Sequence, residues 1–135
     1  MKSIFVRDYM SRRIVSLDQD MEIMAATHLL VENDISGAPV LDSHGRLAGI
    51  LTERDCMKVA LHSGYHDSPY GLVRDYMTSN PEYVAPEQSV LTLAEKFING
   101  SFRRYPVLDN GRLVGIISRR DVLRAIDHRY GGKRS

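Results

Sequence analysis

Cysteine and long apolar runs are the features that this sequence most lacks. Its 135 residues include a single cysteine, Cys56, which excludes an internal disulfide framework and is typical of a reducing cytosol. No apolar run approaches the ~18 residues that a membrane-spanning helix requires, and residues 1–6 lack the apolar segment of a signal peptide. We therefore expect a cytoplasmic protein that makes no contact with a membrane.

Charge of one sign and catalytic motifs are also scarce. The formal net charge is +1, so no global field points to nucleic acid. The five histidines show no metal-ligand spacing with carboxylates or with Cys56. The sequence contains no nucleophile–base pairing, no Walker loop and no glycine-rich dinucleotide motif. We therefore expect no metal site, no required cofactor and no enzymatic activity.

The sequence does contain two copies of one half-domain. Val-Arg-Asp-Tyr-Met occupies residues 6–10 and returns at 73–77, a displacement of 67 positions. Pro-Val-Leu-Asp occupies residues 39–42 and returns at 106–109, again displaced by 67. A repeat of this length is a whole supersecondary unit.

The duplication predicts the domain organisation. We expect two repeats, residues 1–66 and 67–135, joined by a polar linker at about 63–71. Each half alone is near the size at which a hydrophobic core is marginal. We therefore expect the halves to pack together about a pseudo-twofold axis, with a ligand site at their seam.

Within each repeat, the hydrophobic periodicity predicts the order β-α-β-β-α, which is an α+β fold. The two middle strands form a hairpin, and in the second repeat its turn is Asn110-Gly111, the favoured type I′ pair. We expect strands at 14–17, 38–41, 46–51, 82–84, 105–108 and 112–117, and helices at 21–31, 52–61, 89–99 and 118–129.

The unit ends in Gly-Ile-Leu-Thr-Glu-Arg-Asp at 49–55 and in Gly-Ile-Ile-Ser-Arg-Arg-Asp at 115–121. With the two Pro-Val-Leu-Asp strings, these motifs resemble the CBS domain, named after cystathionine β-synthase, and the tandem resembles a CBS pair over essentially the whole chain. The resemblance implies a regulatory module that binds an adenosine-containing ligand in clefts between the repeats. AMP, ADP and ATP are the first choices, and S-adenosylmethionine and NAD are others. It also implies a homodimer that acts on an effector protein, which the sequence does not identify.

Under this resemblance, Asp55 and Asp121 are expected to accept hydrogen bonds from a ribose diol, and Thr52 and Ser118 to reach the phosphate. Each pair lies where a strand ends and a helix begins, so free N–H groups and the helix dipole add anion affinity. A structural interpretation stays open, because Ser or Thr followed three positions later by an acid is close to a capping box.

Arginines distinguish the two repeats, since a planar guanidinium suits phosphate. The second repeat carries Arg103, Arg104, Arg119 and Arg120. At the equivalent positions the first repeat has Ser36, Gly37, Glu53 and Arg54. Solvated surface charge is the alternative interpretation. The expected phosphate-binding arginines are Arg103 and Arg120, then Arg54, Arg104 and Arg119. The residues expected near a purine, with core packing as the alternative, are Val15, Ile35, Gly37, Ala38, Ile50, Phe102, Tyr105 and Ile116.

Two other functions compete with the nucleotide sensor. A ligand-free dimerisation or scaffold module would leave the sites empty and would gain no thermal stability from any nucleotide. A nucleic-acid-binding module would use the arginines and the basic residues of 131–135, and its affinity would fall steeply with salt. The near-neutral net charge argues against nucleic acid.

Overall fold

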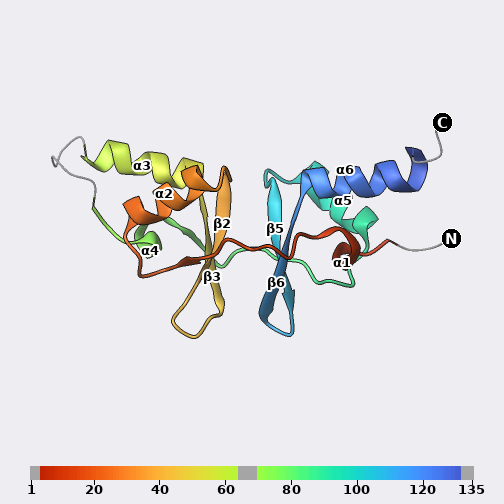
Figure 1. The fold of residues 1–135 in the computed structure, drawn as a ribbon, viewed down its shortest axis with the longest axis horizontal. Helices are drawn as coiled ribbons and strands as arrows, with labels where there is room; N and C mark the ends of the chain where they lie inside the picture. The colour runs from red at the N-terminus through yellow and green to blue at the C-terminus, as the bar shows by residue number, and fades with distance from the viewer. Residues whose placement is uncertain (1–3, 64–69, 132–135) are drawn as a thin grey trace. The chain divides into compact units, whose positions relative to one another are not determined.

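The computed structural model describes residues 4–63 and 70–131 and divides the chain into two compact units (Figure 1). We call Val15–Pro81 the repeat-1 unit, and Met1–Ile14 together with Glu82–Ser135 the repeat-2 unit. The first segment of the chain therefore completes the second repeat, and the segment after the linker completes the first. The boundary predicted at residues 66 and 67 lies outside the described residues.

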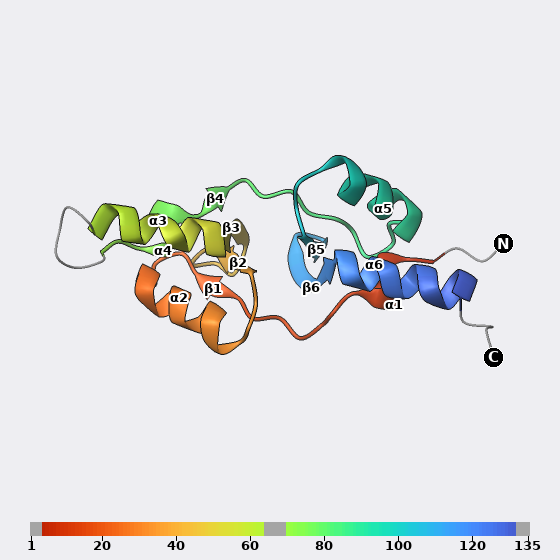
Figure 2. The ribbon, with the colours of Figure 1, turned by 90° about the horizontal axis from the view of Figure 1, so that it is seen from above.

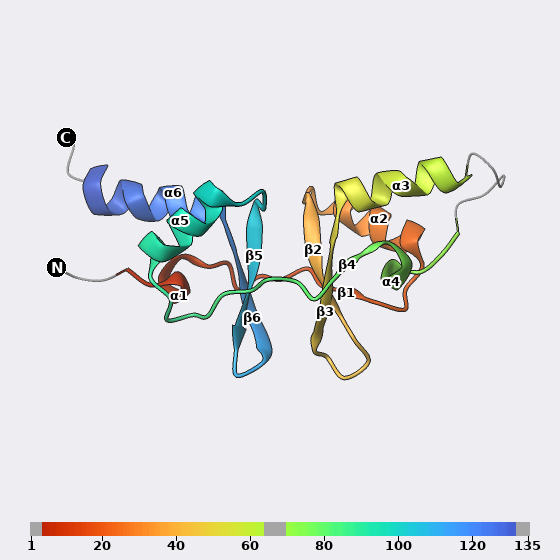
Figure 3. The ribbon, with the colours of Figure 1, turned by 180° about the vertical axis from the view of Figure 1, so that it is seen from behind.

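The repeat-1 unit is a four-stranded sheet with helices packed against it. The sheet has the order β1-β2-β3-β4, in which β1 is parallel to β2 and the other pairs are antiparallel. Helices α2 and α3 pack against each other, and Figure 3 shows β4 and α4 beside β3. The elements are β1 (Leu17–Asp18), α2 (Ile23–Glu32), β2 (Gly37–Leu41), β3 (Leu47–Thr52), α3 (Glu53–Ser63), α4 (Val73–Tyr76) and β4 (Thr78–Ser79).

The repeat-2 unit repeats this plan with shorter outer strands. Ser11 forms an isolated antiparallel bridge with Ile116 on β6, in the place that β4 takes in the repeat-1 unit. Helix α1 packs against α6, as Figure 2 shows from above. The elements are α1 (Val6–Tyr9), α5 (Val90–Asn99), β5 (Arg104–Asp109), β6 (Arg112–Ser118), α6 (Arg119–Ile126) and the π-helical turn η1 (Asp127–Gly131).

The strands predicted at 14–17 and 82–84 are wrong in extent, and the prolines opposite them explain why. The first is only Leu17–Asp18, and the second is a single parallel bridge from Val84 to Val107. The Val84 N–H donates to the Pro106 carbonyl at 3.0 Å, and the Leu108 N–H donates to the Val84 carbonyl at 2.9 Å. Pro106 has no N–H to continue this ladder toward residue 82, and Pro39 limits β1 in the same way.

The hairpin and helix predictions are closer to the structure. Asn110 and Gly111 have φ angles of 52° and 80°, as the predicted type I′ turn requires. The helix predicted at 118–129 is an α-helix only to Ile126 and continues as the π-helical turn. That wider turn carries His128, whose Nδ1 lies 2.9 Å from the Tyr9 hydroxyl of α1.

Each unit has its own hydrophobic core, and equivalent positions of the two repeats fill it. Leu17, Ile23 and Leu51 are buried in the repeat-1 core, and Val84, Val90 and Ile117 take their places in the repeat-2 core. The one-turn helices α4 and α1 contribute Val73 and Val6, both fully buried. These two helices, which the sequence did not predict, therefore belong to the cores.

A glycine in the second hairpin strand of each unit admits a crossing segment. A Cβ atom at Gly49 would lie 2.6 Å from Met77 Sδ and 2.7 Å from the Thr78 carbonyl oxygen. At Gly115 it would lie 2.7 Å from Met10 Sδ and 2.9 Å from the Ser11 carbonyl oxygen. The glycine of each Gly-Ile pair, at 49–50 and 115–116, is therefore required by the close approach of the main chain after α4 or α1.

Candidate functional site

The corner between β3 and α3 holds Thr52 and Asp55 in a reciprocal arrangement. The Thr52 N–H and hydroxyl donate to Asp55 Oδ2 at 2.9 Å and 3.0 Å, and the Asp55 N–H donates to Thr52 Oγ1 at 3.3 Å. Asp55 is the one charged residue among those described that is buried, with 6% of its surface exposed. This geometry is a capping box in which aspartate replaces the usual glutamate or glutamine.

The corner between β6 and α6 has the same geometry. The Ser118 N–H and hydroxyl donate to Asp121 Oδ2 at 2.9 Å and 3.0 Å, and the Asp121 N–H donates to Ser118 Oγ at 3.3 Å. Both hydroxyl–carboxylate pairs therefore form the capping box that the structural interpretation predicted. It leaves the second oxygen, Oδ1, of each carboxylate outside the cap.

A cation on the next turn of the helix forms an ion pair with that second oxygen. Arg124 Nη1 lies 2.8 Å from Asp121 Oδ1, and Lys58 Nζ lies 3.5 Å from Asp55 Oδ1. Sequence reasoning missed both residues. The signal was available, because each cation follows its acid by three positions, a spacing that places side chains on one helix face.

A main-chain hydrogen bond joins a loop to each corner, and in the repeat-2 unit it brings two predicted phosphate-binding arginines together. In the repeat-2 unit, the Arg119 N–H donates to the Arg103 carbonyl at 3.1 Å, and Arg119 Nε donates to the Phe102 carbonyl at 3.2 Å. In the repeat-1 unit, the Glu53 N–H donates to the Ser36 carbonyl at 2.9 Å. The main-chain framework is the same, but an arginine borders one corner and a glutamate the other.

The side chains of the predicted arginines differ in exposure and are more numerous at the repeat-2 corner. Arg103, Arg119 and Arg120 have exposed side chains, and Arg104 is half-buried on β5. Arg54, the counterpart of Arg120, is exposed on the first turn of α3. The repeat-2 corner is therefore the more strongly cationic of the two.

The predicted purine-contacting residues differ in how far they are buried. The side chains of Ala38 and Tyr105 belong to the cores, so they pack as the alternative interpretation expected and leave only main-chain atoms for a ligand. Burial raises the pKa of the Tyr105 phenol above its ordinary value of 10.0. Gly37 is also buried, and Phe102 is exposed beside Tyr105 with ring centroids 5.6 Å apart. The half-buried members are Val15, Ile35, Ile50 and Ile116.

Among the described residues, neither the cysteine nor the acidic side chains add a further candidate site. Burial raises the pKa of the Cys56 thiol above its ordinary value of 9.0, and this opposes formation of the reactive thiolate. Residues 4–63 and 70–131 contain no group of three or more His, Cys, Asp or Glu that could hold a metal ion. In the same residues, no helix is long and apolar enough to cross a membrane.

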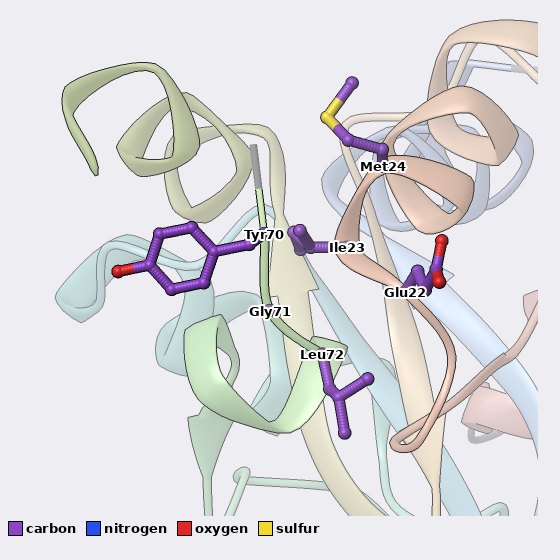
Figure 4. Close-up of a pocket in the computed structure, with 6 residues that line it drawn as sticks. All are labelled: Glu22, Ile23, Met24, Tyr70, Gly71 and Leu72. Atoms are coloured by element: carbon purple, nitrogen blue, oxygen red, sulfur yellow. The ribbon is translucent and has the colours of Figure 1, made fainter. Parts of the chain in front are cut away.

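The hollows on the described surface include one in each unit. One, of about 360 Å³, separates the start of α2 from the segment before α4, and Figure 4 shows Glu22 and Met24 on one side and Tyr70 and Leu72 on the other. The other, of about 490 Å³, lies between α5 and α6 and includes Arg119 among apolar side chains. Arg119 is the one predicted site residue that lines either of them.

The fold and the corners define a class of protein built from two β-α-β-β-α units with a hydroxyl–carboxylate pair at each strand-to-helix corner. The CBS domain model matches residues 6–62 and 73–128. The chain therefore belongs to the CBS domain family, and the fold class and the tandem pair predicted from the sequence are confirmed.

Solved CBS pairs are similar over nearly the whole chain. The CBS-pair protein CBSX2 from Arabidopsis thaliana is 29% identical, with a TM-score of 0.83 over 94% of this chain and 96% of that one. CBSX2 in complex with AMP has a TM-score of 0.81 at 28% identity, over 92% of this chain and 96% of that one. The CBS domain pair of protein MJ0100, in complex with 5′-methylthioadenosine and S-adenosyl-L-methionine, has a TM-score of 0.79 at 26% identity, over 95% and 99%.

Curated relatives match in part of their length. An uncharacterized protein of Methanocaldococcus jannaschii, MJ1225, is 27% identical over 90% of this chain and 42% of its own. The chain spans 42%, 68% and 14% of the first three such relatives. The predictions of a non-enzymatic role and of a cytoplasmic location stay predictions.

Proposed function

We propose that this chain is a regulatory module that binds an adenine nucleotide, AMP, ADP or ATP, at the strand-to-helix corners of its repeats. The observation that carries the proposal is the repeat-2 corner, where a fixed hydroxyl–carboxylate pair adjoins a loop bearing arginines. The complexes of CBSX2 with AMP and of MJ0100 with S-adenosyl-L-methionine support an adenosyl ligand.

The roles follow from the chemistry of each group. Asp121 would accept hydrogen bonds from the ribose diol, and Asp55 would do so in the repeat-1 unit. Ser118 and Thr52 would contact phosphate. Arg103 and Arg120 would bind phosphate oxygens first, with Arg54, Arg104 and Arg119 assisting, because guanidinium groups bind phosphate in a bidentate manner. The purine would contact main-chain atoms and the side chains of Val15, Ile35, Ile50, Phe102 and Ile116.

The two corners would prefer ligands of different charge. Arg103 and Arg119 border Ser118, whereas Ser36 and Glu53 stand at the equivalent positions beside Thr52. A carboxylate next to a bound phosphate is repulsive. We therefore assign ADP and ATP to the repeat-2 corner and the less anionic AMP to the repeat-1 corner. The effector would respond only as far as the ligand binds two conformations of the module with different affinity.

A thermal unfolding experiment tests the proposal against the ligand-free scaffold. We expect a nucleotide at 100 times its dissociation constant to raise the free energy of unfolding by ~2.7 kcal/mol, because it binds only the folded chain. The measurement is a melting-temperature series with AMP, ADP, ATP, NAD and S-adenosylmethionine, with inorganic phosphate as the control. No shift with any adenosyl compound would favour the scaffold instead.

We also propose that the module forms a homodimer through exposed apolar side chains on α3 and α6, the last helix of each repeat. Leu123 on α6 and Leu61 on α3 are 61% and 73% exposed. Leu123 and Ile126 line the hollow between α5 and α6. Exposed apolar surface of this kind is typical of protein interfaces.

The dimer is tested by introducing a charge on this surface. We expect Leu123→Glu to convert the dimer to a monomer, because burying an unpaired carboxylate in an interface is strongly unfavourable. Light scattering coupled to size exclusion measures the mass. Leu91→Glu is the matched control, since Leu91 is 63% exposed but lies outside that hollow. A wild-type chain that is monomeric at all concentrations would contradict the dimer.

A further inference from the structure

The acceptor capacity of Asp121 restricts how a ribose can bind to it. A carboxylate oxygen accepts about two hydrogen bonds. Both positions on Oδ2 are taken by the Ser118 N–H and hydroxyl, at 2.9 Å and 3.0 Å. Any diol that binds Asp121 while the cap stays intact must therefore use Oδ1.

Arg124 already occupies that oxygen. Its Nη1 donates to Asp121 Oδ1 at 2.8 Å, a charge-assisted hydrogen bond of short length. The Asp121 side chain is 15% exposed, so the surrounding protein leaves few other approaches to it. Two ribose hydroxyls and one guanidinium N–H require three acceptor positions, and Oδ1 offers about two.

We propose that Arg124 is a built-in competitor of the ligand at the repeat-2 corner, and that it must leave Asp121 Oδ1 before a ribose diol binds there. The proposal rests on the proposed function, because it assumes that Asp121 binds ribose. Arg124 is then a residue that sets ligand affinity without being part of the binding set.

Arg124 also contacts the Tyr9 ring in the same conformation. Its guanidinium carbon lies 5.6 Å from the centroid of the Tyr9 ring, within the range of a cation–π contact. The Tyr9 hydroxyl is in turn 2.9 Å from His128 Nδ1. Once Arg124 leaves Asp121, the Tyr9 ring can hold it. The competitor therefore connects the corner to α1 at the beginning of the chain.

The repeat-1 corner carries a weaker version of the same device. Lys58 Nζ lies 3.5 Å from Asp55 Oδ1, beyond the usual length of a charge-assisted hydrogen bond. Lysine is also a more strongly hydrated cation than arginine. We therefore expect the competitor to restrain the repeat-2 corner more than the repeat-1 corner.

The test uses adenosine, which has the ribose diol but no phosphate that Arg124 could attract. In an Asp55→Asn background, which removes the carboxylate of the repeat-1 corner, calorimetric titration compares Arg124 with Arg124→Gln. We expect Arg124→Gln to bind adenosine about two- to fivefold more tightly, the range in which exposed ion pairs contribute. Arg124→Lys should fall between them. Arg7→Gln, which removes the same charge from α1 of the same unit, should leave the affinity unchanged.

The salt dependence of adenosine affinity is a second measurement. It would not change if Arg124 had only a structural role. Screening weakens the Arg124–Asp121 pair, so the affinity of Asp55→Asn for adenosine should rise between 0.05 and 0.5 M KCl on the order of twofold. The same change in salt should leave Arg124→Gln unaffected.

The outcomes separate the competitor from the proposed function. Unchanged or weaker adenosine binding by Arg124→Gln would overturn the competitor, while binding that still depends on Asp121 would keep the proposed function. Adenosine binding that is equally tight in an Asp121→Asn variant would overturn both. The absence of adenosine and AMP binding in every variant, the wild type included, would also overturn both.

Discussion

The Asp121→Ala variant is expected to lose AMP affinity at the repeat-2 corner by more than about 100-fold. Two hydrogen bonds to a charged acceptor would disappear, each worth about 1.5–3 kcal/mol. The chain should stay folded, because the substitution removes a cap and no part of the core. The free energy of unfolding should fall by about 1 kcal/mol, as is typical for loss of a helix cap. Calorimetric titration with AMP and urea denaturation measure the two effects.

Asp8→Ala is the matched control for the loss of a cap. Asp8 Oδ2 accepts a hydrogen bond from the Phe5 N–H at 3.1 Å, a capping contact in the same unit but outside the corner. This variant should lose a similar amount of stability and bind AMP as the wild type does. Asp121→Ala that binds AMP as tightly as the wild type would remove Asp121 from the ligand site.

The Gly49→Ala variant is expected to lose about 2–3 kcal/mol of unfolding free energy, the upper range for overpacking a filled interior. The new methyl group would lie 2.7 Å from the Thr78 carbonyl oxygen, and main-chain atoms cannot swing aside as a side chain can. β4 must therefore move from β3, on which Gly49 pairs with Ser79. Gly115→Ala should have a comparable effect through the Ser11 carbonyl oxygen.

Gly45→Ala is the control that separates steric crowding by the new methyl group from the loss of glycine's backbone freedom. Gly45 has a φ of +77°, but no atom lies within 4 Å of the position that its Cβ would take. Its replacement should cost only about 1 kcal/mol, from the left-handed backbone. Denaturant unfolding of the three variants gives the comparison. A smaller loss for Gly49→Ala than for Gly45→Ala would show that the crossing segment moves freely.

Much of the fold could be predicted because the repeat and the periodicity are local signals. The Asn110-Gly111 turn and the helices near 21–31 and 89–99 are encoded by neighbouring residues. α1 and α4 could not be predicted, since four residues make one turn and carry no periodicity. Their conformation depends on the burial of Val6 and Val73 in cores that other segments supply.

The candidate site was predictable where spacing alone fixes geometry. The three-residue spacing of Thr52 and Asp55 brings their side chains together in any helix start, and it does so here. The position of Tyr105 was not predictable, because which face of β5 meets the core depends on the pairing of strands. The role of Arg124 required the atoms themselves, since it follows from which carboxylate oxygen is already occupied.

The exchange of segments between the repeats has a consequence for how the chain folds as it is synthesised. The repeat-1 unit is continuous, so it can close as soon as residue 81 has left the ribosome. Val6 and Ser11 are made before the rest of their unit, so Ser11 has no strand to join until residue 116 follows. The docking of this segment therefore requires a loop of about a hundred residues to close, which favours slow folding. A circularly permuted chain that begins at residue 82 and joins residue 135 to residue 1 would bring this segment next to its own unit and should remove that delay.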